Sequence, residues 1–191
     1  VRALFEEASD ALHLDMKKLC FDGTDAELAM TENTQPALLT ASVAAFRVWM
    51  QEAGIKPSLA AGHSLGEYSA LVAIGAIPFA TAVSWVRARG AAMQKAVPSG
   101  QGTMAAILGM EDAPLEALCK EASDLAKQER SPSSELTVEA VVEPANFNSP
   151  GQIVIAGSTD GIEKASTLIK AGKFGSGKVI PLQVSAPFHC R

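Results

Sequence analysis

Gly62-His63-Ser64-Leu65-Gly66 separates an apolar run, Pro57 to Ala61, from a helix-like run that begins at Glu67. A short strand, a Gly-x-Ser-x-Gly turn and an apolar helix together describe a nucleophile elbow, which holds its serine in a strained, exposed conformation at the edge of a sheet. The string alone is a weak signal, because it occurs more often in plain turns. Here the expected strand and helix supply the context that the motif requires, so we predict that Ser64 is a nucleophile.

The neighbours of Ser64 are the residue types that an elbow needs. Gly62 and Gly66 would leave room where the strand enters the turn and the helix leaves it, because a side chain at either position would collide with the crossing backbone. The amide of Leu65, the first after the nucleophile, would point towards a developing oxyanion at the positive end of the following helix. We therefore expect the Leu65 N–H to stabilise an oxyanion.

The composition limits the class of protein. With 191 residues and 48% hydrophobic residues, the chain can bury the core of one domain, or of one domain that carries a smaller insert. The formal net charge is -5 and Lys and Arg do not cluster, which argues against nucleic acid as a main partner. No apolar run is long enough to cross a bilayer and no signal-peptide pattern is present, so we expect no membrane partner.

The three cysteines, Cys20, Cys119 and Cys190, are odd in number and have no metal-like spacing. This usage is typical of free thiols in a reducing compartment. We therefore expect a cytoplasmic protein without a metal site.

Hydrophobic periodicity predicts that the first half of the chain is mostly helical. The predicted helices are residues 1–20, a short helix with a capping box of Thr24 and Glu27, residues 37–52, residues 67–74 and residues 78 to about 97. Asn33 and Thr34 offer N-caps for the helix of residues 37–52, and Pro36 fits its first turn. Gly54 is a natural C-cap for it.

The second half alternates strand and helix patterns. The predicted elements are a strand at 102–109, a helix at 112–129, strands at 137–142 and 152–156 joined by a turn at 146–151, a helix at 160–170 and a strand at 178–184. The order β-α-β-β-α-β is that of a ferredoxin-like unit. We interpret residues 102–184 as a small subdomain inserted into an α/β scaffold.

A serine hydroxyl needs a neighbouring base, usually histidine, and the chain has three histidines. His13 lies in the first predicted helix, and His63 adjoins Ser64 on an extended segment, where adjacent side chains point opposite ways. His189 follows the last predicted strand, where a base on a loop would be placed, so we predict that it is the base. Residues 164–191 contain no Asp or Glu. An earlier acid, a backbone or amide oxygen, or a group outside this sequence would then orient the imidazole.

Arg89 lies in a small and apolar stretch, Ala88-Arg89-Gly90-Ala91-Ala92. An arginine on a helix is usually solvated. A guanidinium that faces inwards here would instead want an anion, and its fixed fork would select a substrate with a free carboxylate.

Several motifs occur together in a characteristic order: Thr34-Gln35-Pro36-Ala37, Gly62 to Tyr68, Arg89-Gly90, Asn146 to Gln152 and Ala186-Pro187-Phe188-His189-Cys190. Together they resemble the malonyl-CoA:acyl carrier protein transacylases of fatty acid synthesis, and the match runs over nearly the whole chain. The resemblance implies a hydrolase-like α/β core at residues 1–101, a ferredoxin-like subdomain at 102–184, and a return to the core at 185–191. The chain opens without Met and lacks the family's opening strand and its segment after the histidine, so we expect truncation at both ends.

The resemblance also implies the chemistry. Ser64 would take malonyl from coenzyme A as an ester, with His189 acting first as base and then as acid, and Arg89 would pair with the malonyl carboxylate. The phosphopantetheine thiol of an acyl carrier protein would then collect the acyl group. No cofactor beyond the coenzyme A thioester is implied, and we expect a monomer.

Two further residues are assigned to substrate binding. Gln35 is similar to the family's cleft glutamine, although a plain helix-capping role fits it as well. The ring of Phe188, beside the base, would leave little room for a methyl branch, which favours malonyl over methylmalonyl.

Two other functions remain compatible with the elbow. A serine esterase or thioesterase would give the acyl group to water and would have no use for a buried Arg89. A binding module that retains the fold of an enzyme would not depend on Ser64.

Overall fold

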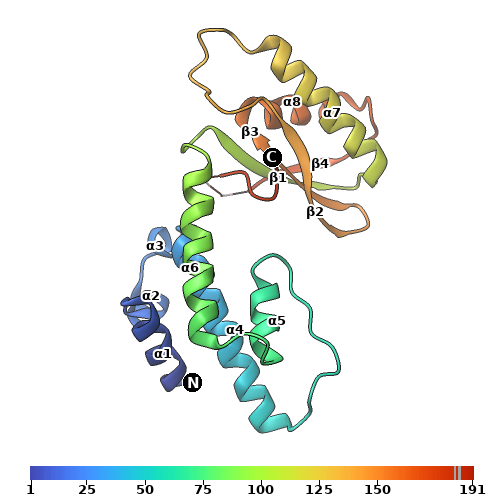
Figure 1. The fold of residues 1–191 in the computed structure, drawn as a ribbon. Helices are drawn as coiled ribbons and strands as arrows, with labels where there is room; N and C mark the ends of the chain where they lie inside the picture. Colours follow the sequence, from blue (N-terminus) through green and yellow to red (C-terminus); the bar gives the residue numbers. More distant parts are fainter. Residues whose placement is uncertain (183, 185) are drawn as a thin grey trace. The chain divides into compact units, whose positions relative to one another are not determined.

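The computed structural model describes residues 1–182, 184 and 186–191, which form a mixed α/β structure (Figure 1). The chain divides into two compact units, Val1–Gln94 and Lys95–Arg191. Each unit has its own hydrophobic core, so each is described by itself.

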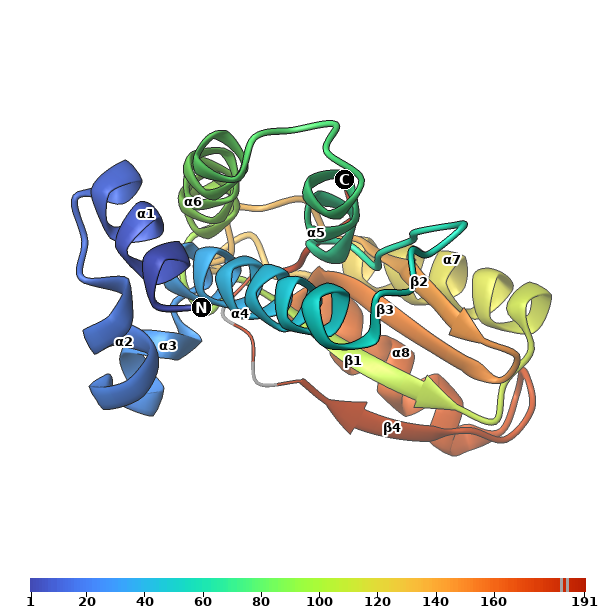
Figure 2. The ribbon, with the colours of Figure 1, turned by 90° about the horizontal axis from the view of Figure 1, so that it is seen from below.

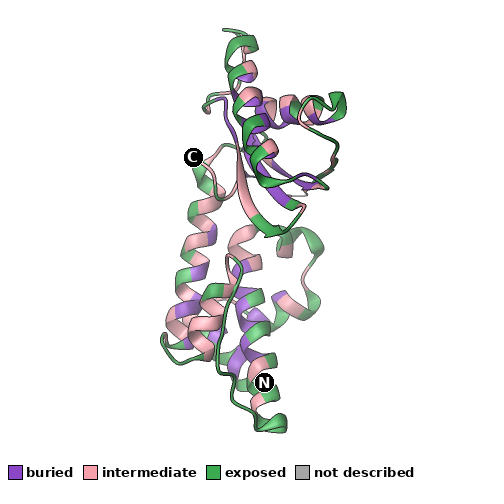
Figure 3. Cartoon of the chain, turned by 90° about the vertical axis from the view of Figure 1, so that its right-hand side faces the viewer, coloured by how far each residue is buried: buried purple, intermediate pink, exposed green. Residues whose placement is uncertain are grey.

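The first unit is helical in its described residues. Its helices are α1 (Arg2–Leu12), α2 (Met16–Asp22), α3 (Asp25–Ala29), α4 (Thr31–Ala53), α5 (Gly66–Ala73) and α6 (Phe79–Ala96), whose C-terminal end falls in the second unit. The core is built from one face of each long helix, including Leu4 of α1, Leu39 of α4 and Val83 of α6. Figure 3 shows these buried faces in purple on helices whose other faces are exposed.

The single helix predicted for residues 1–20 is wrong, because the chain turns after Leu12. His13 adopts a left-handed conformation, with φ 49°, and its amide donates to the carbonyl of Ser9. Asp15 then caps α2 by accepting from the amide of Lys18, and the Ser9 hydroxyl accepts from the amide of Met16. The helical periodicity ran across the break because α1 and α2 both pack on the same core.

The capping box predicted at Thr24 and Glu27 is confirmed at the start of α3. Helix α4 begins earlier than predicted, so Asn33 and Thr34 lie within the helix rather than capping it, and Pro36 lies in its interior. The predicted C-cap is confirmed, since Gly54 ends α4 in a left-handed conformation with φ 64°. Helices α5 and α6 lie within one residue of their predicted bounds.

The strand predicted at residues 57–61 is wrong. Residues 54–63 carry no regular structure and are exposed, with Leu59 91% exposed. A strand requires a neighbour to satisfy its backbone groups, and the described residues of the first unit contain no strand with which this segment could pair.

The second unit is a four-stranded sheet with two helices. Its elements are β1 (Gly102–Leu108), α7 (Asp112–Glu129), β2 (Val142–Ser149), β3 (Gln152–Ser158), α8 (Thr159–Ala171) and β4 (Lys178–Pro181). The strand order is β2-β3-β1-β4, and all neighbours are antiparallel (Figure 1).

The two faces of this sheet are both apolar. Ile107 of β1 and Ile155 of β3 face α7 and α8, which cover the same side of the sheet (Figure 2). On the opposite face, Met104, Ala106, Val154 and Ala156 form a smaller cluster, against which Phe188 packs. Alternation along β1 and β3 therefore supplies two separate apolar surfaces.

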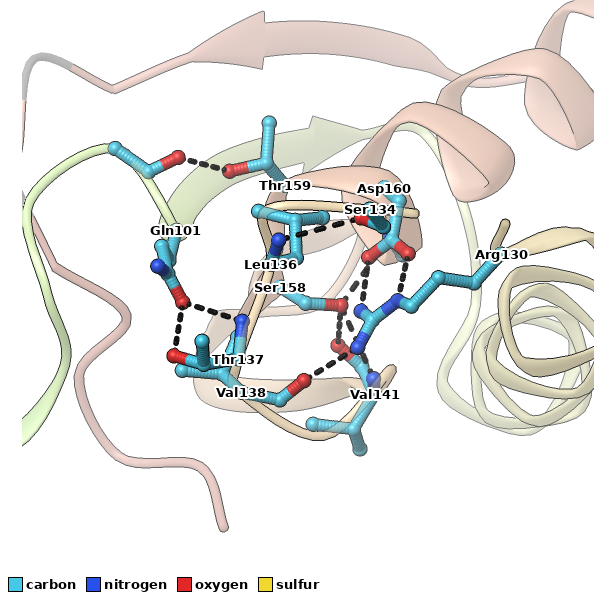
Figure 4. A network of polar contacts seen from close by, with 12 residues as sticks. Gln101, Arg130, Ser134, Leu136, Thr137, Val138, Val141, Ser158, Thr159 and Asp160 are labelled. Atoms are coloured by element: carbon cyan, nitrogen blue, oxygen red, sulfur yellow. Dashed lines mark hydrogen bonds and ion pairs between the residues drawn. The ribbon is translucent and has the colours of Figure 1, made fainter. Parts of the chain in front are cut away.

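Strand β2 lies later in the chain than predicted. Residues 137–141 are irregular, the strand begins at Val142, and it runs through most of the predicted turn to Ser149. Side chains from elsewhere satisfy the backbone of the irregular segment: the amide of Thr137 donates to Gln101 Oε1, and the carbonyl of Val138 accepts from Arg130 (Figure 4). The predicted last strand ends early at Pro181, and Gln183, within its predicted range, lies outside the described residues.

An ion pair closes this network. Arg130 donates from Nε to Asp160 Oδ2 and from Nη2 to Oδ1, each at 2.8 Å, and both side chains are mostly buried (Figure 4). Burial alone would raise the pKa of Asp160, but the hydrogen bonds from Arg130 and Ser158 outweigh it and lower that pKa. The ionised carboxylate is therefore the form that the folded unit prefers.

We expect Asp160→Asn to reduce the free energy of unfolding by about 1 to 3 kcal/mol at pH 7, because it removes the charge from a bidentate pair. Since the pKa of Asp160 is lower in the folded than in the unfolded chain, its contribution is present above about pH 4 and is lost as the pH falls through the lowered value. Urea unfolding at pH 7 and pH 3 measures this, with exposed Asp124→Asn as the control. A deficit of equal size at both pH values would contradict the assignment.

All three cysteines are free thiols, as predicted. Burial, with the carboxylates of Glu143 and Glu116, raises the pKa of Cys119 to about 12, which keeps this thiol protonated and unreactive. Among the described residues, no helix combines the length and the apolar character needed to cross a bilayer.

Candidate active site

The elbow around Ser64 has the strained backbone that the motif predicts. Ser64 adopts a left-handed conformation with φ 51° and is half-buried, immediately before α5. The turn is closed by the amide of Gly66, which donates to the carbonyl of His63 at 2.8 Å. A non-glycine residue in this region costs about 1 kcal/mol or more, which surrounding contacts must offset.

The two glycines of the motif differ in their role. A Cβ at Gly62 would lie 1.8 Å from the carbonyl carbon of Gly66 and 2.0 Å from its oxygen, which confirms that the backbone leaves no room there. A Cβ at Gly66 would meet no heavy atom of a described residue within 4 Å, so the collision predicted at Gly66 is wrong. Gly66 instead supplies the backbone against which Gly62 packs.

We expect Gly62→Ala to lower the free energy of unfolding by about 3 kcal/mol or more, because the elbow cannot close around the added methyl group. Gly66→Ala is the matched control and should be neutral or stabilising by about 0.5 to 1 kcal/mol, since alanine is favoured over glycine in a helix. Urea unfolding of both variants decides between them. Equal midpoints would mean that the close approach at Gly62 is not required.

Leu65 links the elbow to the helix that follows. It has helical dihedral angles, φ -59° and ψ -35°, and stands at the N-cap position of α5. Its amide therefore lies at the positive end of the α5 dipole, where an oxyanion would be stabilised.

Arg89 of α6 joins three segments of the first unit. Its Nη1 donates to Gln35 Oε1 of α4 at 2.6 Å, and its Nη2 donates to Ser64 Oγ at 3.1 Å. The guanidinium carbon also lies 5.9 Å from the centroid of the Tyr68 ring on α5. No carboxylate of a described residue forms an ion pair with Arg89, so the positive charge beside Ser64 is free to attract an anion.

Gln35 is only 4% exposed, and its amide is held at both ends. While Oε1 accepts from Arg89, Nε2 donates to Met93 Sδ, with a nitrogen–sulfur distance of 3.3 Å. A capping role is excluded by position, because α4 begins four residues earlier, at Thr31. Gln35 therefore acts on Arg89 rather than on the helix end.

The structure holds Phe188 and His189 in the second unit. The amide of Phe188 donates to Met104 Sδ at 3.4 Å, and its ring packs against the smaller apolar cluster of the sheet. His189 is exposed and has a positive φ of 61°. The segment is anchored next to β1, since a Cβ at Gly102 would lie 2.4 Å from Pro187 Cδ.

The structure thus brings together Ser64, Leu65, Arg89 and Gln35 within one unit. Sequence reasoning missed Tyr68 and Met93 as members of this group. Spacing was an available signal for both, because Tyr68 follows Ser64 by four positions and Met93 follows Arg89 by four on a helix.

Comparison with known proteins identifies a family for this arrangement. The family model of the acyl transferase domain matches residues 6–185. The chain is 50% identical over 190 residues to the malonyl CoA-acyl carrier protein transacylase of Escherichia coli K12, covering 100% of this chain and 56% of the relative. It is 48% identical over 188 residues to the protein of that name in Bacillus subtilis strain 168, covering 98% and 54%.

Solved structures agree with these relatives. An acyl-carrier-protein S-malonyltransferase from Burkholderia pseudomallei 1710b superposes with a TM-score of 0.84 at 51% identity, covering 98% of this chain and 56% of that one. A malonyl-transacylase in complex with a type II polyketide synthase acyl-carrier protein superposes with a TM-score of 0.86 at 45% identity, covering 99% and 56%. The chain spans about half the length of the relatives it matches.

Proposed function

The chain belongs to the acyl transferase domain family, and from this premise we propose that it transfers a malonyl group from malonyl-CoA to the phosphopantetheine thiol of an acyl carrier protein. The observation that carries the proposal is the guanidinium of Arg89 at 3.1 Å from Ser64 Oγ, without a carboxylate partner among the described residues. A malonyl ester on Ser64 places its free carboxylate only a few bonds from Oγ, within reach of this cation.

The first half-reaction forms an ester on Ser64. Ser64 Oγ attacks the thioester carbonyl while His189 accepts the hydroxyl proton, and the Leu65 amide stabilises the oxyanion. The carbon–sulfur bond then breaks, His189 donates the proton taken from Ser64 to the departing thiolate sulfur, and coenzyme A leaves as the free thiol. No cofactor takes part in this step.

The second half-reaction reverses these roles. His189 takes the proton of the phosphopantetheine thiol, whose sulfur attacks the ester carbonyl. The bond to Ser64 Oγ breaks, and the proton passes to Oγ, so that the free serine is restored and the carrier protein leaves as the malonyl thioester.

Arg89 and Gln35 share the recognition of the carboxylate. Gln35 Oε1 accepts a hydrogen bond from Arg89 Nη1, while Arg89 Nη2 points towards Ser64. The guanidinium is therefore oriented before the acyl group arrives. Such preorganisation lowers the cost of fixing a long side chain on binding. We assign Phe188 the exclusion of a methyl branch, as its size suggests.

The finer architecture belongs to the same proposal. The order β-α-β-β-α-β and the strand order β2-β3-β1-β4 support a ferredoxin-like subdomain at residues 102–184. Residues 1–101 would belong to a hydrolase-like core and 185–191 would return to it, although Ser185 lies outside the described residues. We further propose a cytoplasmic monomer, in keeping with its free thiols.

Intact-mass spectrometry after brief exposure to malonyl-CoA, with acetyl-CoA in parallel, tests the function. We expect a malonyl adduct that peptide mapping places on Ser64 and that the thiol of a carrier protein removes. Release to water at the same rate with and without carrier protein would support the esterase alternative. If a folded protein takes up acyl groups from neither donor, the proposal is wrong and a binding module becomes the better account.

A further inference from the structure

Pro36 creates a local problem in helix α4. Because proline has no backbone N–H, the carbonyl four residues earlier loses its partner within the helix, and here that carbonyl belongs to Glu32. A carbonyl left without a partner is costly where water is limited. The helix nevertheless continues unbroken from Thr31 to Ala53.

Arg87 of α6 supplies the missing donor. Its Nη1 donates to the carbonyl of Glu32 at 3.2 Å and also to Asn33 Oδ1. Its Nη2 lies 3.7 Å from the Glu32 carboxylate, and both side chains are about two-thirds buried, with 32% and 29% exposed. One guanidinium therefore ties α6 to the first turn of α4 through two hydrogen bonds and one ion pair.

Gly90 provides a second close contact between α6 and the first turn of α4. Three residues after Arg87, Gly90 lets the two helices approach, since a Cβ there would lie 2.6 Å from Glu32 Cα and 2.6 Å from the carbonyl oxygen of Thr31. Arg89 lies between Arg87 and Gly90 in the sequence of α6, and Gln35 lies two residues after Asn33 in the sequence of α4. Because the contacts of Arg87 and Gly90 fix α6 against the first turn of α4, they also fix where the Arg89 side chain, on another face of α6, meets Gln35.

We propose that Arg87 is a positioning residue for Arg89: it satisfies the Glu32 carbonyl left open by Pro36 and fixes α6 against α4 in the register that pairs Arg89 with Gln35. Arg87 acts through this register and touches no substrate. The effect on malonyl selectivity rests on the proposed function, whereas the effect on the Arg89 guanidinium does not.

The first test measures the guanidinium itself. In protein labelled with ¹⁵N-arginine, a guanidinium fixed by hydrogen bonds gives separate Nη–H signals, and a rotating one gives merged signals; Arg89→Lys assigns them. We expect Arg87→Met to merge the Arg89 signals, whereas Arg2→Met, which removes an exposed arginine from α1, leaves them separate. Separate Arg89 signals in a folded Arg87→Met protein would overturn the proposal, whether or not the protein is a transferase.

The second test measures selectivity. We expect Arg87→Met to lower the ratio of malonyl to acetyl loading on Ser64 by about tenfold, mainly through KM for malonyl-CoA, with no change in Arg2→Met. In Arg87→Met, the rate at which Ser64 reacts with phenylmethylsulfonyl fluoride, which carries no carboxylate, should equal that of the parent. If Arg87→Met does not fold, Arg87→Gln, which keeps one N–H for the Glu32 carbonyl, replaces it with a smaller expected loss.

Two backgrounds test the mechanism. In Pro36→Ala, the amide at position 36 can again reach the Glu32 carbonyl, so Arg87→Met should cost less selectivity than in the parent. In Arg89→Ala, Arg87→Met should cost no further selectivity, because its effect passes through Arg89. A loss of equal size in the parent, in Pro36→Ala and in Arg89→Ala would show that Arg87 acts by another route.

Discussion

Replacing Ser64 by alanine should lower kcat for malonyl transfer on the order of a million-fold, because in the proposed mechanism the hydroxyl forms the covalent intermediate and no step bypasses it at comparable rate. The malonyl adduct should disappear from the intact-mass spectrum together with the activity. Ser84→Ala is the matched control, since its hydroxyl donates to the carbonyl of Ala80 within α6, and its rate should stay near that of the parent.

The backbone at Ser64 offers a second control. Ser64→Gly should be as inactive as Ser64→Ala yet more stable by about 1 kcal/mol, because glycine adopts the observed φ of 51° without strain. Thermal unfolding of the two variants measures the difference. Retention of transfer in either variant would remove Ser64 from the chemistry.

Replacing Arg89 by alanine should cost about 2 to 5 kcal/mol in kcat/KM for malonyl-CoA, with far less effect on acetyl-CoA. The physical reason is the loss of the cation that lies 3.1 Å from Ser64 Oγ and has no carboxylate partner among the described residues. Arg89→Lys should have a kcat/KM for malonyl-CoA between those of the parent and Arg89→Ala. A lysine keeps the positive charge, but a single ammonium cannot hold both Gln35 and a carboxylate in a fixed fork. Steady-state kinetics with both donors measures these differences.

The two donors also separate the alternatives. An equal loss for malonyl and acetyl would mean that Arg89 supports the elbow rather than the carboxylate. An unchanged rate for both would favour an esterase of neutral substrates, which has no use for this arginine.

Sequence patterns over a few residues correctly predicted the helices and caps whose bounds depend on neighbouring residues. Helix α7 begins and ends at the predicted residues, and Gly54 ends α4 as expected, because periodicity and capping are properties of a few neighbouring residues. The strands predicted at 57–61 and 137–142 failed for the opposite reason. Whether an apolar run becomes a strand depends on a partner elsewhere in the chain.

The site was predictable only in part for the same reason. The small, apolar residues around Arg89 predicted a guanidinium that pairs with an anion, and the Gly-x-Ser-x-Gly motif predicted that Ser64 is a nucleophile. Their contact, and the contact of Arg89 with Gln35, join residues 25 and 54 positions apart. No pattern of neighbouring residues predicts a contact across such sequence separations. The hydrogen bond between Gln35 and Arg89 therefore became clear only from the structure.

The two hydrogen bonds of the Gln35 amide limit how acyl selectivity could be redesigned. Removing Arg89 alone, to admit an uncharged acyl group, would leave the Gln35 amide oxygen buried without its donor, at a cost of about 1 to 3 kcal/mol. Leucine at position 35 together with a small residue at position 89 would remove both polar groups at once. Residues 35 and 89 should therefore be exchanged together. The sulfur of Met93, which now accepts from Gln35, would then contact an apolar side chain.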